Sequence, residues 1–225
     1  FQTRSDKASR SFYAAPDEKI IFYVGRLVKE KGVQVLLDGA PEILANYPQT
    51  KFIIAGKGPH LGALKQQAEL LGIANRVYFT GYINDDVRNS LYSWSDVAVF
   101  PSLYEPFGIV ALEAMAARTP VVVSDCGGIS EIVRQGIDGL KVRTGNSHSL
   151  ARNILTLLKK PELGEKLKEN AYQRVVEEFN WQSIARQTIS VYKEVLKASR
   201  TAVWEAPERQ SGFFGRFNRR LARYS

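Results

Sequence analysis

The sequence predicts an α/β fold in which a doubly wound parallel sheet is followed by helices. Short apolar runs alternate with longer segments of helical period along the first 142 residues. The runs are continuously apolar rather than alternating, which is typical of parallel strands covered by helices on both faces. After residue 142 the pattern is purely helical. Strand–helix repetition of this kind predicts a ligand site outside the carboxyl ends of the strands.

The predicted strands are short and rich in β-branched and aromatic residues, so they are too short for core helices. They are Ile20–Val24, Phe52–Ala55, Val77–Thr80, Val97–Phe100, Val121–Ser124 and, more weakly, Leu140–Val142.

The predicted helices each place apolar side chains on one stripe. They are Gly32–Asn46, Leu61–Leu71, Asp85–Trp94, Ile109–Ala117, Ile129–Arg134, Ser147–Lys159, Glu162–Glu178 and Trp181–Ser199. Pro161 precedes the seventh of them and suits a first helical turn, where its missing N–H costs little.

Composition excludes several classes of protein. The 225 residues are 44% hydrophobic, as in an ordinary globular protein. The net charge of +8 favours anionic partners, although a moderate excess spread over a domain is usually a solvated surface. Cys126 is the only cysteine, so no intramolecular disulfide is possible and a reducing, cytoplasmic compartment is expected. His60 and His148 lie apart from other ligand residues, which argues against a zinc site or a Ser-His-Asp triad. No apolar run reaches the roughly 18 residues that span a bilayer.

Both ends of the chain differ from its middle. Residues 1–18 are polar and weakly patterned, and we expect a linker from a missing N-terminal domain; 19–200 form the predicted domain. In the tail, 201–225, aromatic residues interleave with five arginines. Residues 211–225 could form a basic amphipathic helix on the inner face of an anionic membrane, or a flexible terminus.

The first candidate site segment reads GRLVKEKG and follows the first strand. Gly25 comes directly after the predicted strand. Arg26 and Lys31 come after it and are five positions apart. Both cations could reach a diphosphate, Arg bidentately and Lys as a mobile point charge. Solvated charges beside a helix are the alternative.

The second candidate segment reads SLYEPFGIVALEAM and contains two glutamates, Glu105 and Glu113. A helix is predicted to begin near Gly108, and the free amides of its first turn favour an anion. Glu105 could accept hydrogen bonds from sugar hydroxyls and Glu113 from a ribose. Alternatively Glu105 caps the helix and Glu113 is a surface charge.

Three further segments allow weaker interpretations. The glycines of GKGPHLG and of SDCGGISEIV follow strands, and either could approach a phosphate or form a plain turn. The adjacent acids Asp85 and Asp86 could hold a metal ion, but their place after Asn84 is better explained by helix capping. We therefore predict no metal site.

Together these motifs resemble glycosyltransferase family 4. The stretches that carry the resemblance are GRLVKEKG, FIIAGKGP, VYFTGYI, DVAVFPSLYEPFGIVALEAMAARTPVVVSDCGGISEIV and DGLKV, over about 20–145. Ser130, Cys126 and Lys57 depart mildly from the family pattern.

The resemblance implies one half of a GT-B fold, a Rossmann-like domain that binds a nucleoside-diphosphate sugar. It implies sugar transfer with retention, without a metal ion or other cofactor, to a saccharide or lipid-linked acceptor. By this resemblance Arg26, Lys31 and Glu105 act in catalysis. The donor would contact Gly25, Tyr82, Ile83, Arg88, Phe107, Gly108, Ile109, Val110 and Glu113. Without the N-terminal acceptor domain, we expect the isolated chain to transfer little or no sugar.

Other function classes have less support. A non-catalytic module that binds a nucleotide or a partner protein is the main alternative, although folding alone does not demand all four charged residues. A nicotinamide-dependent oxidoreductase would need fingerprint glycines after the first strand, where GRLVKEKG stands instead. Nucleic-acid binding is not expected, because the aromatic residues fall mostly in strand and helix cores.

Overall fold

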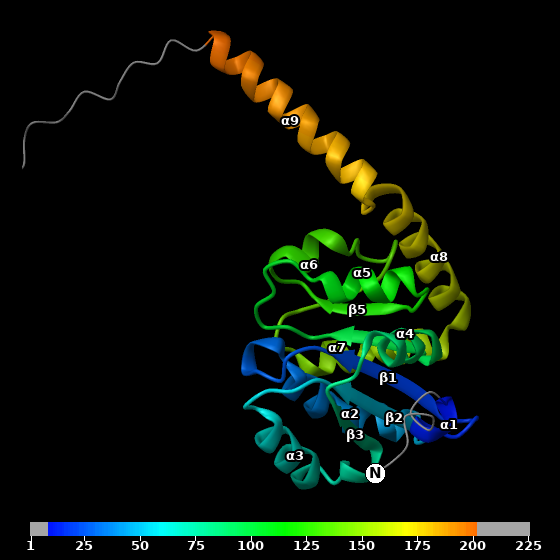
Figure 1. Cartoon of the computed structure of the whole chain (residues 1–225). Coiled ribbons are helices and arrows are strands. Elements are labelled where there is room, and N and C mark those ends of the chain that lie inside the picture. The colour runs from blue at the N-terminus through cyan, green and yellow to red at the C-terminus, as the bar shows by residue number, and fades with distance from the viewer. Residues whose placement is uncertain (1–8, 202–225) are drawn as a thin grey trace, which may run out of the picture. The chain divides into compact units, whose positions relative to one another are not determined.

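A computed structural model describes residues 9–201 and contains a six-stranded, entirely parallel sheet (Figure 1). The strand order is β3-β2-β1-β4-β5-β6. The strands are β1 (Lys19–Val24), β2 (Thr50–Ala55), β3 (Val77–Gly81), β4 (Val97–Phe100), β5 (Val121–Ser124) and β6 (Leu140–Val142). The predicted α/β doubly wound fold is confirmed. The order reverses between β1 and β4, which is where a fold of this kind places its ligand.

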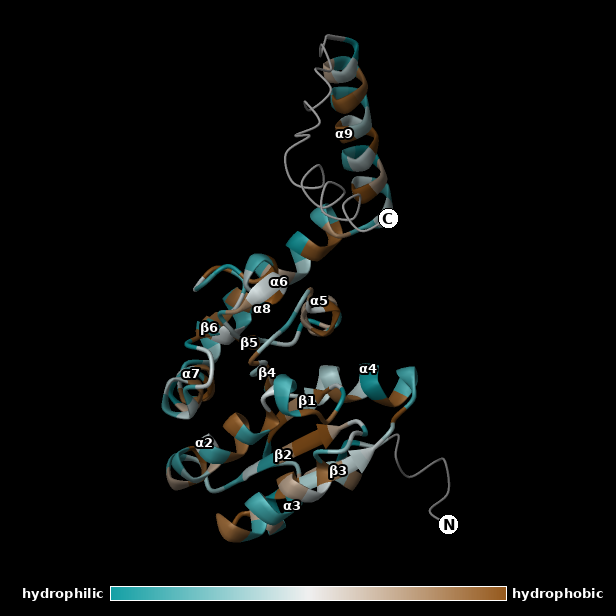
Figure 2. Ribbon diagram, turned by 90° about the vertical axis from the view of Figure 1, so that its left-hand side faces the viewer, coloured by the Kyte–Doolittle hydropathy of each residue, from teal (hydrophilic) through white to brown (hydrophobic). Residues whose placement is uncertain are grey.

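Helices cover both faces of the sheet, and Figure 2 shows α2 and α7 on one side and α4 and α5 on the other. One apolar cluster joins the sheet to α2 (Val33–Asn46), α3 (Leu61–Leu70) and α7 (Ser147–Lys159). The opposite cluster joins it to α4 (Asp85–Trp94), α5 (Ile109–Ala116) and α6 (Gly127–Ile132). The inner strands β2, β1, β4 and β5 are almost fully buried, which explains their continuous apolarity. The edge strand β3 is only partly buried.

Two short 3₁₀ turns and one long helix complete this part of the chain. The turns are η2 (Lys29–Lys31) and η3 (Ala74–Arg76). Helix α8 (Pro161–Glu178) begins at its proline, as predicted, and packs against α5 and α7. A buried carboxylate helps to hold α8, because Asp138 lies 3.2 Å from the guanidinium of Arg174 and 2.6 Å from that of Arg134.

The chain forms two compact units, one ending at Trp181 and one beginning at Gln182. The described part of the second unit lies in α9 (Trp181–Thr201). Its apolar side chains are exposed; they include Ile184, Val191, Tyr192, Val195 and Leu196. None of the helices in residues 9–201 is long and apolar enough to cross a bilayer. The predicted amphipathic tail, 211–225, lies outside the described residues.

Two local features differ from expectation. Part of the segment assigned to a linker packs against the sheet: Arg10–Tyr13 form a short helix, α1, and Tyr13 is 5% exposed. Helix α6 covers 127–132 rather than 129–134. It begins earlier because its two glycines press against the loop of Glu105, where the amide of Gly128 donates to the Glu105 carbonyl at 2.9 Å. It ends earlier because Val133 is extended.

Candidate active site at the carboxyl edge of the sheet

An acidic and a basic side chain from distant segments meet beyond the carboxyl ends of β1 and β4. The ammonium of Lys31 donates to a carboxylate oxygen of Glu105 at 2.6 Å. The Glu105 side chain is only 8% exposed, and Ser102 also donates to it, at 3.3 Å. A carboxylate so far from water needs this compensation, since an unpaired buried charge is costly.

Close backbone contacts set the position of Lys31. The amides of Leu103 and Tyr104 donate to the carbonyl of Glu30 at 2.8 and 3.2 Å. Gly32 has φ +70, and a Cβ there would lie 1.8 Å from the carbonyl oxygen of Pro101. Only glycine allows both this conformation and this approach. The loop after β1 is therefore seated on the loop after β4, which brings Lys31 to Glu105.

The start of α5 adds backbone amides to this edge. Gly108 precedes the helix in a left-handed conformation, with φ +99. Glu105 does not cap this helix, which has no side-chain cap. The amides of Ile109 and Val110 lie in the first turn, where they have no intrahelical acceptor. Phe107 and Ile109 are 52% and 59% exposed. This edge thus offers hydrogen-bond donors and an exposed apolar surface together.

Beside the strand ends lies a cavity of about 330 Å³, called here the Arg26 cavity. It is lined by Val24, Gly25, Arg26, Gly56, Lys57, Tyr82, Ile83, Asp85 and Arg88. Five of these residues were predicted to bind the donor or to act in catalysis. The guanidinium of Arg26 has no carboxylate partner among residues 9–201, so it is open to an anionic ligand.

Glu113 lies on α5 and connects that helix to the Arg26 cavity. Its carboxylate is 3.5 Å from Nε of Arg88 and 3.2 Å from the hydroxyl of Tyr92. The Arg88 contact is an ion pair rather than a directed hydrogen bond, because Arg88 Nε is buried without a hydrogen-bond partner. Arg88 also reaches Asp85 at 3.1 Å. Glu113 is thus held from two sides, and its side chain stays 28% exposed.

Two buried tyrosines link these groups. Tyr23 donates to the carbonyl of Arg26 at 3.1 Å. Burial, and then the charge of Glu105, raises the pKa of Tyr23, while Arg26 lowers it. Burial and the charge of Glu113 likewise raise the pKa of Tyr92. Both hydroxyls therefore keep their protons near neutral pH and remain donors. The Tyr23 hydroxyl thus contacts the backbone of Arg26, and the charges of Arg26 and Glu105 both act on it.

Lys31 itself is not among the residues that line the Arg26 cavity. The predicted residues therefore form two adjoining parts: the cavity around Arg26, and the Lys31–Glu105 pair near the start of α5. Tyr23, Tyr92 and Ser102 were not predicted. In the sequence Tyr23 and Tyr92 look like ordinary core aromatics, and only their hydroxyl contacts reveal a role at the site.

The weaker sequence interpretations also have structural outcomes. Asn84 caps α4, accepting from the amide of Val87 at 3.0 Å, as the capping interpretation of Asp85 and Asp86 requires. Within 9–201, no group of three or more His, Cys, Asp or Glu side chains is arranged to hold a metal ion. The GKGPHLG segment forms a tight turn against the loop after β1, since a Cβ on Gly56 would lie 1.8 Å from the carbonyl oxygen of Gly25.

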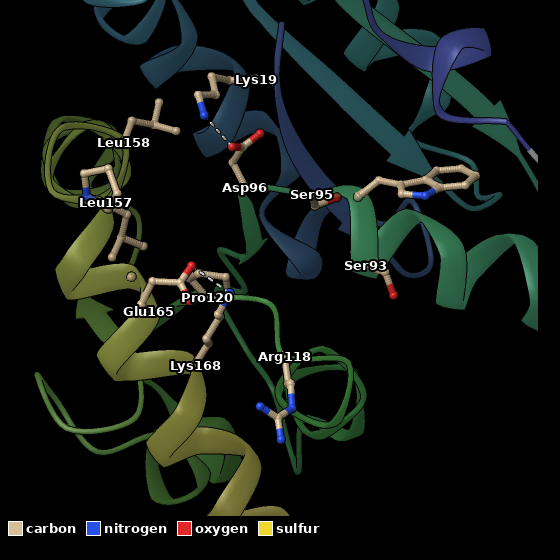
Figure 3. A pocket seen from close by; sticks show the side chains of 13 residues that line it. Lys19, Ser93, Ser95, Asp96, Arg118, Pro120, Leu157, Leu158, Glu165 and Lys168 are labelled. Carbon is tan, nitrogen blue, oxygen red and sulfur yellow. Dashed lines mark hydrogen bonds and ion pairs between the residues drawn. The ribbon is translucent and has the colours of Figure 1, made fainter. Parts of the chain in front are cut away.

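A second cavity, also about 330 Å³, lies at the opposite edge of the sheet, beside the amino ends of β1, β4 and β5 (Figure 3). Its charged side chains hold one another: Lys19 pairs with Asp96 at 2.8 Å, and Lys168 with Glu165 at 2.7 Å. Arg118 pairs with Glu169 and lies 4.0 Å from the centre of the Tyr172 ring. Of these ion pairs, only Arg118–Glu169 joins α8 to the segment before β5, and within the described residues each cation of this cavity has an anionic partner, unlike Arg26.

Comparison with known proteins agrees with this geometry. Residues 5–174 match the model of the family "Glycosyl transferases group 1". An uncharacterized glycosyltransferase of Methanocaldococcus jannaschii is 42% identical over 184 residues, which are 82% of this chain and 47% of that protein. The chain thus spans about half the length of that relative.

Solved structures share the fold. Sucrose-phosphate synthase of Thermosynechococcus elongatus has a TM-score of 0.74 at 33% identity, covering 85% of this chain and 49% of the other. The HepE protein of Anabaena, solved with UDP and also with UDP-glucose, has a TM-score of 0.76 for the UDP complex at 28% identity. That match covers 85% of this chain and 53% of the other. The chain therefore belongs to the group 1 glycosyl transferases.

Proposed function

We propose that this chain is the donor-binding half of a retaining glycosyltransferase of family 4. It would take a hexose-type sugar from a nucleoside diphosphate. The observation that carries the proposal is the unpaired guanidinium of Arg26, which lies at the same sheet edge as the Lys31–Glu105 pair and the free amides of α5. Cations and helix amides together suit a diphosphate.

Each group has a role in this proposal. Arg26 and Lys31 bind the diphosphate, and Glu105 accepts hydrogen bonds from hydroxyls of the donor sugar. Glu113 binds the ribose. The amides near the start of α5, the turn after β3 and the remaining cavity residues complete the donor site; they are Phe107, Gly108, Ile109, Val110, Gly25, Tyr82, Ile83 and Arg88.

The chemical demand of the reaction fits these groups. When the bond between the sugar's anomeric carbon and the diphosphate oxygen breaks, its electron pair leaves with the nucleoside diphosphate, while the acceptor hydroxyl oxygen bonds to that carbon. Cations and amides placed on the departing oxygens stabilise this charge, at about 3 kcal/mol per well-placed donor. They could do so without a metal ion. The proton of the acceptor hydroxyl goes to a phosphate oxygen of the departing nucleoside diphosphate, which has gained the electron pair of the broken bond.

The chain covers about half of its relatives, so a second half would have to supply the acceptor site and the opposite wall of the cleft. We propose that the acceptor is a saccharide or a lipid-linked saccharide. The isolated chain would then bind nucleotide but transfer little sugar. The UDP and UDP-glucose complexes of the Anabaena neighbour support a uridine-type donor carrying a hexose.

A calorimetric titration with UDP tests donor binding directly. Arg26→Ala is expected to weaken binding at least about tenfold, because a charge-assisted contact to phosphate contributes roughly 1.5–3 kcal/mol. Arg152→Ala is the matched control, since Arg152 is exposed on α7 and does not line the cavity. Equal UDP affinity in the wild type and both variants would reject the assignment. Retention would be tested on the chain joined to its acceptor half, by the anomeric configuration of the product.

A further inference from the structure

A lysine and an exposed aromatic ring face each other at the Arg26 cavity. The ammonium of Lys57, in the loop after β2, lies 6.0 Å from the centre of the Tyr82 ring, in the loop after β3. Tyr82 is 72% exposed, although both residues line the cavity. An exposed ring on a cavity wall offers a flat surface on which a nucleobase can stack.

The charged side chains around this cavity offer mainly hydrogen-bond donors. Arg26, Lys57 and Arg88 can donate but not accept. The carboxylate of Asp85 is the one charged acceptor that lines the cavity, and it lies 3.1 Å from Nη1 of Arg88. The exocyclic group of a base that enters the cavity therefore faces mainly hydrogen-bond donors. A carbonyl oxygen satisfies such a donor, whereas an exocyclic amino group leaves two donors facing each other.

Lys57 is the cation best placed to contact the base edge. Arg88 is already engaged by Asp85 and Glu113. Lys57 has no carboxylate partner among residues 9–201. Its backbone is fixed, because its carbonyl accepts from the amide of Leu27 at 2.9 Å. A fixed backbone with a flexible, unpaired ammonium lets this side chain follow a ligand that stacks on Tyr82.

We propose that Lys57 is a specificity-determining residue that selects keto bases. Its ammonium donates to the carbonyl oxygen at C4 of uracil, or at C6 of guanine, while the base stacks on Tyr82. The chain then prefers UDP to CDP and GDP to ADP. This inference rests on the proposed donor site and adds to it a chemical criterion for the base.

UDP and CDP make a sharp test, since cytosine carries an amino group where uracil carries the C4 carbonyl. Calorimetry on the wild type is expected to give a Kd for CDP about tenfold above that for UDP, because the amino group of cytosine cannot accept the hydrogen bond that Lys57 donates. Lys57→Met keeps the length of the side chain and removes the donor, so the CDP/UDP ratio should fall to near one. Lys65→Met, an exposed lysine on α3 outside the Arg26 cavity, should keep the wild-type ratio.

Inorganic pyrophosphate separates the two levels of the proposal. If the wild type binds neither pyrophosphate nor any nucleoside diphosphate, the donor site itself is wrong, and the base selection fails with it. If pyrophosphate and UDP bind but CDP binds as tightly as UDP, only the role of Lys57 is overturned. An unchanged ratio in Lys57→Met, with an unchanged melting temperature of the free protein, would overturn that role equally.

Discussion

The ammonium of Lys31 lies 2.6 Å from the carboxylate of Glu105, although 74 positions separate the two residues in the chain. The two members of the pair differ in exposure. Glu105 is buried and needs a positive partner, while Lys31 is 23% exposed and can also contact a ligand. An anionic donor would share Lys31, and sugar hydroxyls would then offer Glu105 replacement hydrogen bonds.

Removing one member of this pair should cost stability as well as binding. Lys31→Met leaves the buried Glu105 carboxylate without its cation. It is expected to lower the free energy of unfolding by about 2 kcal/mol, less than for a fully buried pair because Lys31 is partly exposed. The double variant Lys31→Met, Glu105→Gln removes both charges and should recover part of that loss. Urea denaturation measures both variants.

UDP titration separates the structural role of Lys31 from its ligand role. The double variant recovers part of the stability but still lacks the Lys31 ammonium, so its UDP binding should stay weaker than that of the wild type. If the double variant recovered UDP affinity together with stability, Lys31 would not contact the diphosphate. If the single variant were as stable as the wild type, Lys31 would not stabilise the Glu105 carboxylate.

The second prediction concerns the close contact between Gly32, next to Lys31, and the loop after β4. Gly32→Ala places a Cβ 1.8 Å from the Pro101 carbonyl oxygen and also strains a left-handed conformation. We expect a loss of about 2–4 kcal/mol in the free energy of unfolding, and weaker UDP binding because Lys31 moves with the loop. Gly136→Ala is the matched control: it has the same φ of +70 but no atom within 4 Å of the added Cβ.

The control isolates the close approach from the backbone strain. Gly136→Ala should cost only about 1 kcal/mol and leave UDP affinity unchanged. Equal losses in the two variants would mean that backbone conformation, and not the contact with Pro101, determines the cost at Gly32.

The central sheet could be predicted from the sequence because its signal is local. The inner strands are short runs of apolar residues because helices cover both faces of the sheet, so each run can be recognised from its own residues. The order of the strands and the contact of the loops after β1 and β4 are not local. They depend on the reversal of strand order between β1 and β4, which a single sequence does not display.

The candidate site was predictable only in part for the same reason. Arg26, Lys31 and the two glutamates stand out as charges after predicted strands, and the family resemblance assigned their roles. Tyr23 and Tyr92 were missed because an aromatic residue in an apolar pattern usually indicates packing. The start of α6 was placed two residues late because glycine is a poor helix former, and the contact of Gly128 with Glu105 appears only in three dimensions.

The third prediction concerns the hold on Glu113. The Tyr92 hydroxyl lies 3.2 Å from the Glu113 carboxylate and, in our proposal, positions it for the ribose. Tyr92→Phe should weaken the binding of UDP several-fold. It should leave the binding of 2′,3′-dideoxyuridine 5′-diphosphate nearly unchanged, since that ligand lacks the ribose hydroxyls. Calorimetry with the two ligands distinguishes this positioning role from a general loss of stability, which would weaken the binding of both ligands alike.

Tyr47→Phe serves as the control for losing a partly buried, hydrogen-bonded tyrosine hydroxyl. Tyr47 donates to the carbonyl of Leu158 at 3.1 Å, in a contact that joins α2 to α7 away from the site. It should lower stability slightly and affect both ligands equally. If Tyr92→Phe also affected both ligands equally, Tyr92 would be a packing residue only.

The fourth prediction is a sensitivity to alkaline pH that originates at Tyr23. Burial, followed by the charge of Glu105, raises the pKa of Tyr23 above its ordinary value of 10.0. In the folded protein this hydroxyl keeps its proton at pH values where the unfolded chain has lost it. Its contribution to stability is therefore complete below pH 10 and is lost as the pH rises further, by up to about 1.4 kcal/mol per pH unit.

Tyr23→Phe separates this titration from the other alkaline effects. Near neutral pH the variant should be about 1 kcal/mol less stable, because it loses the hydrogen bond to the Arg26 carbonyl. Above pH 10 the wild type loses stability more steeply, so the two stability curves should converge. Denaturant unfolding between pH 8 and about 11 measures both slopes. Parallel curves would show that the Tyr23 proton is not linked to folding, and that water reaches this hydroxyl in the folded protein.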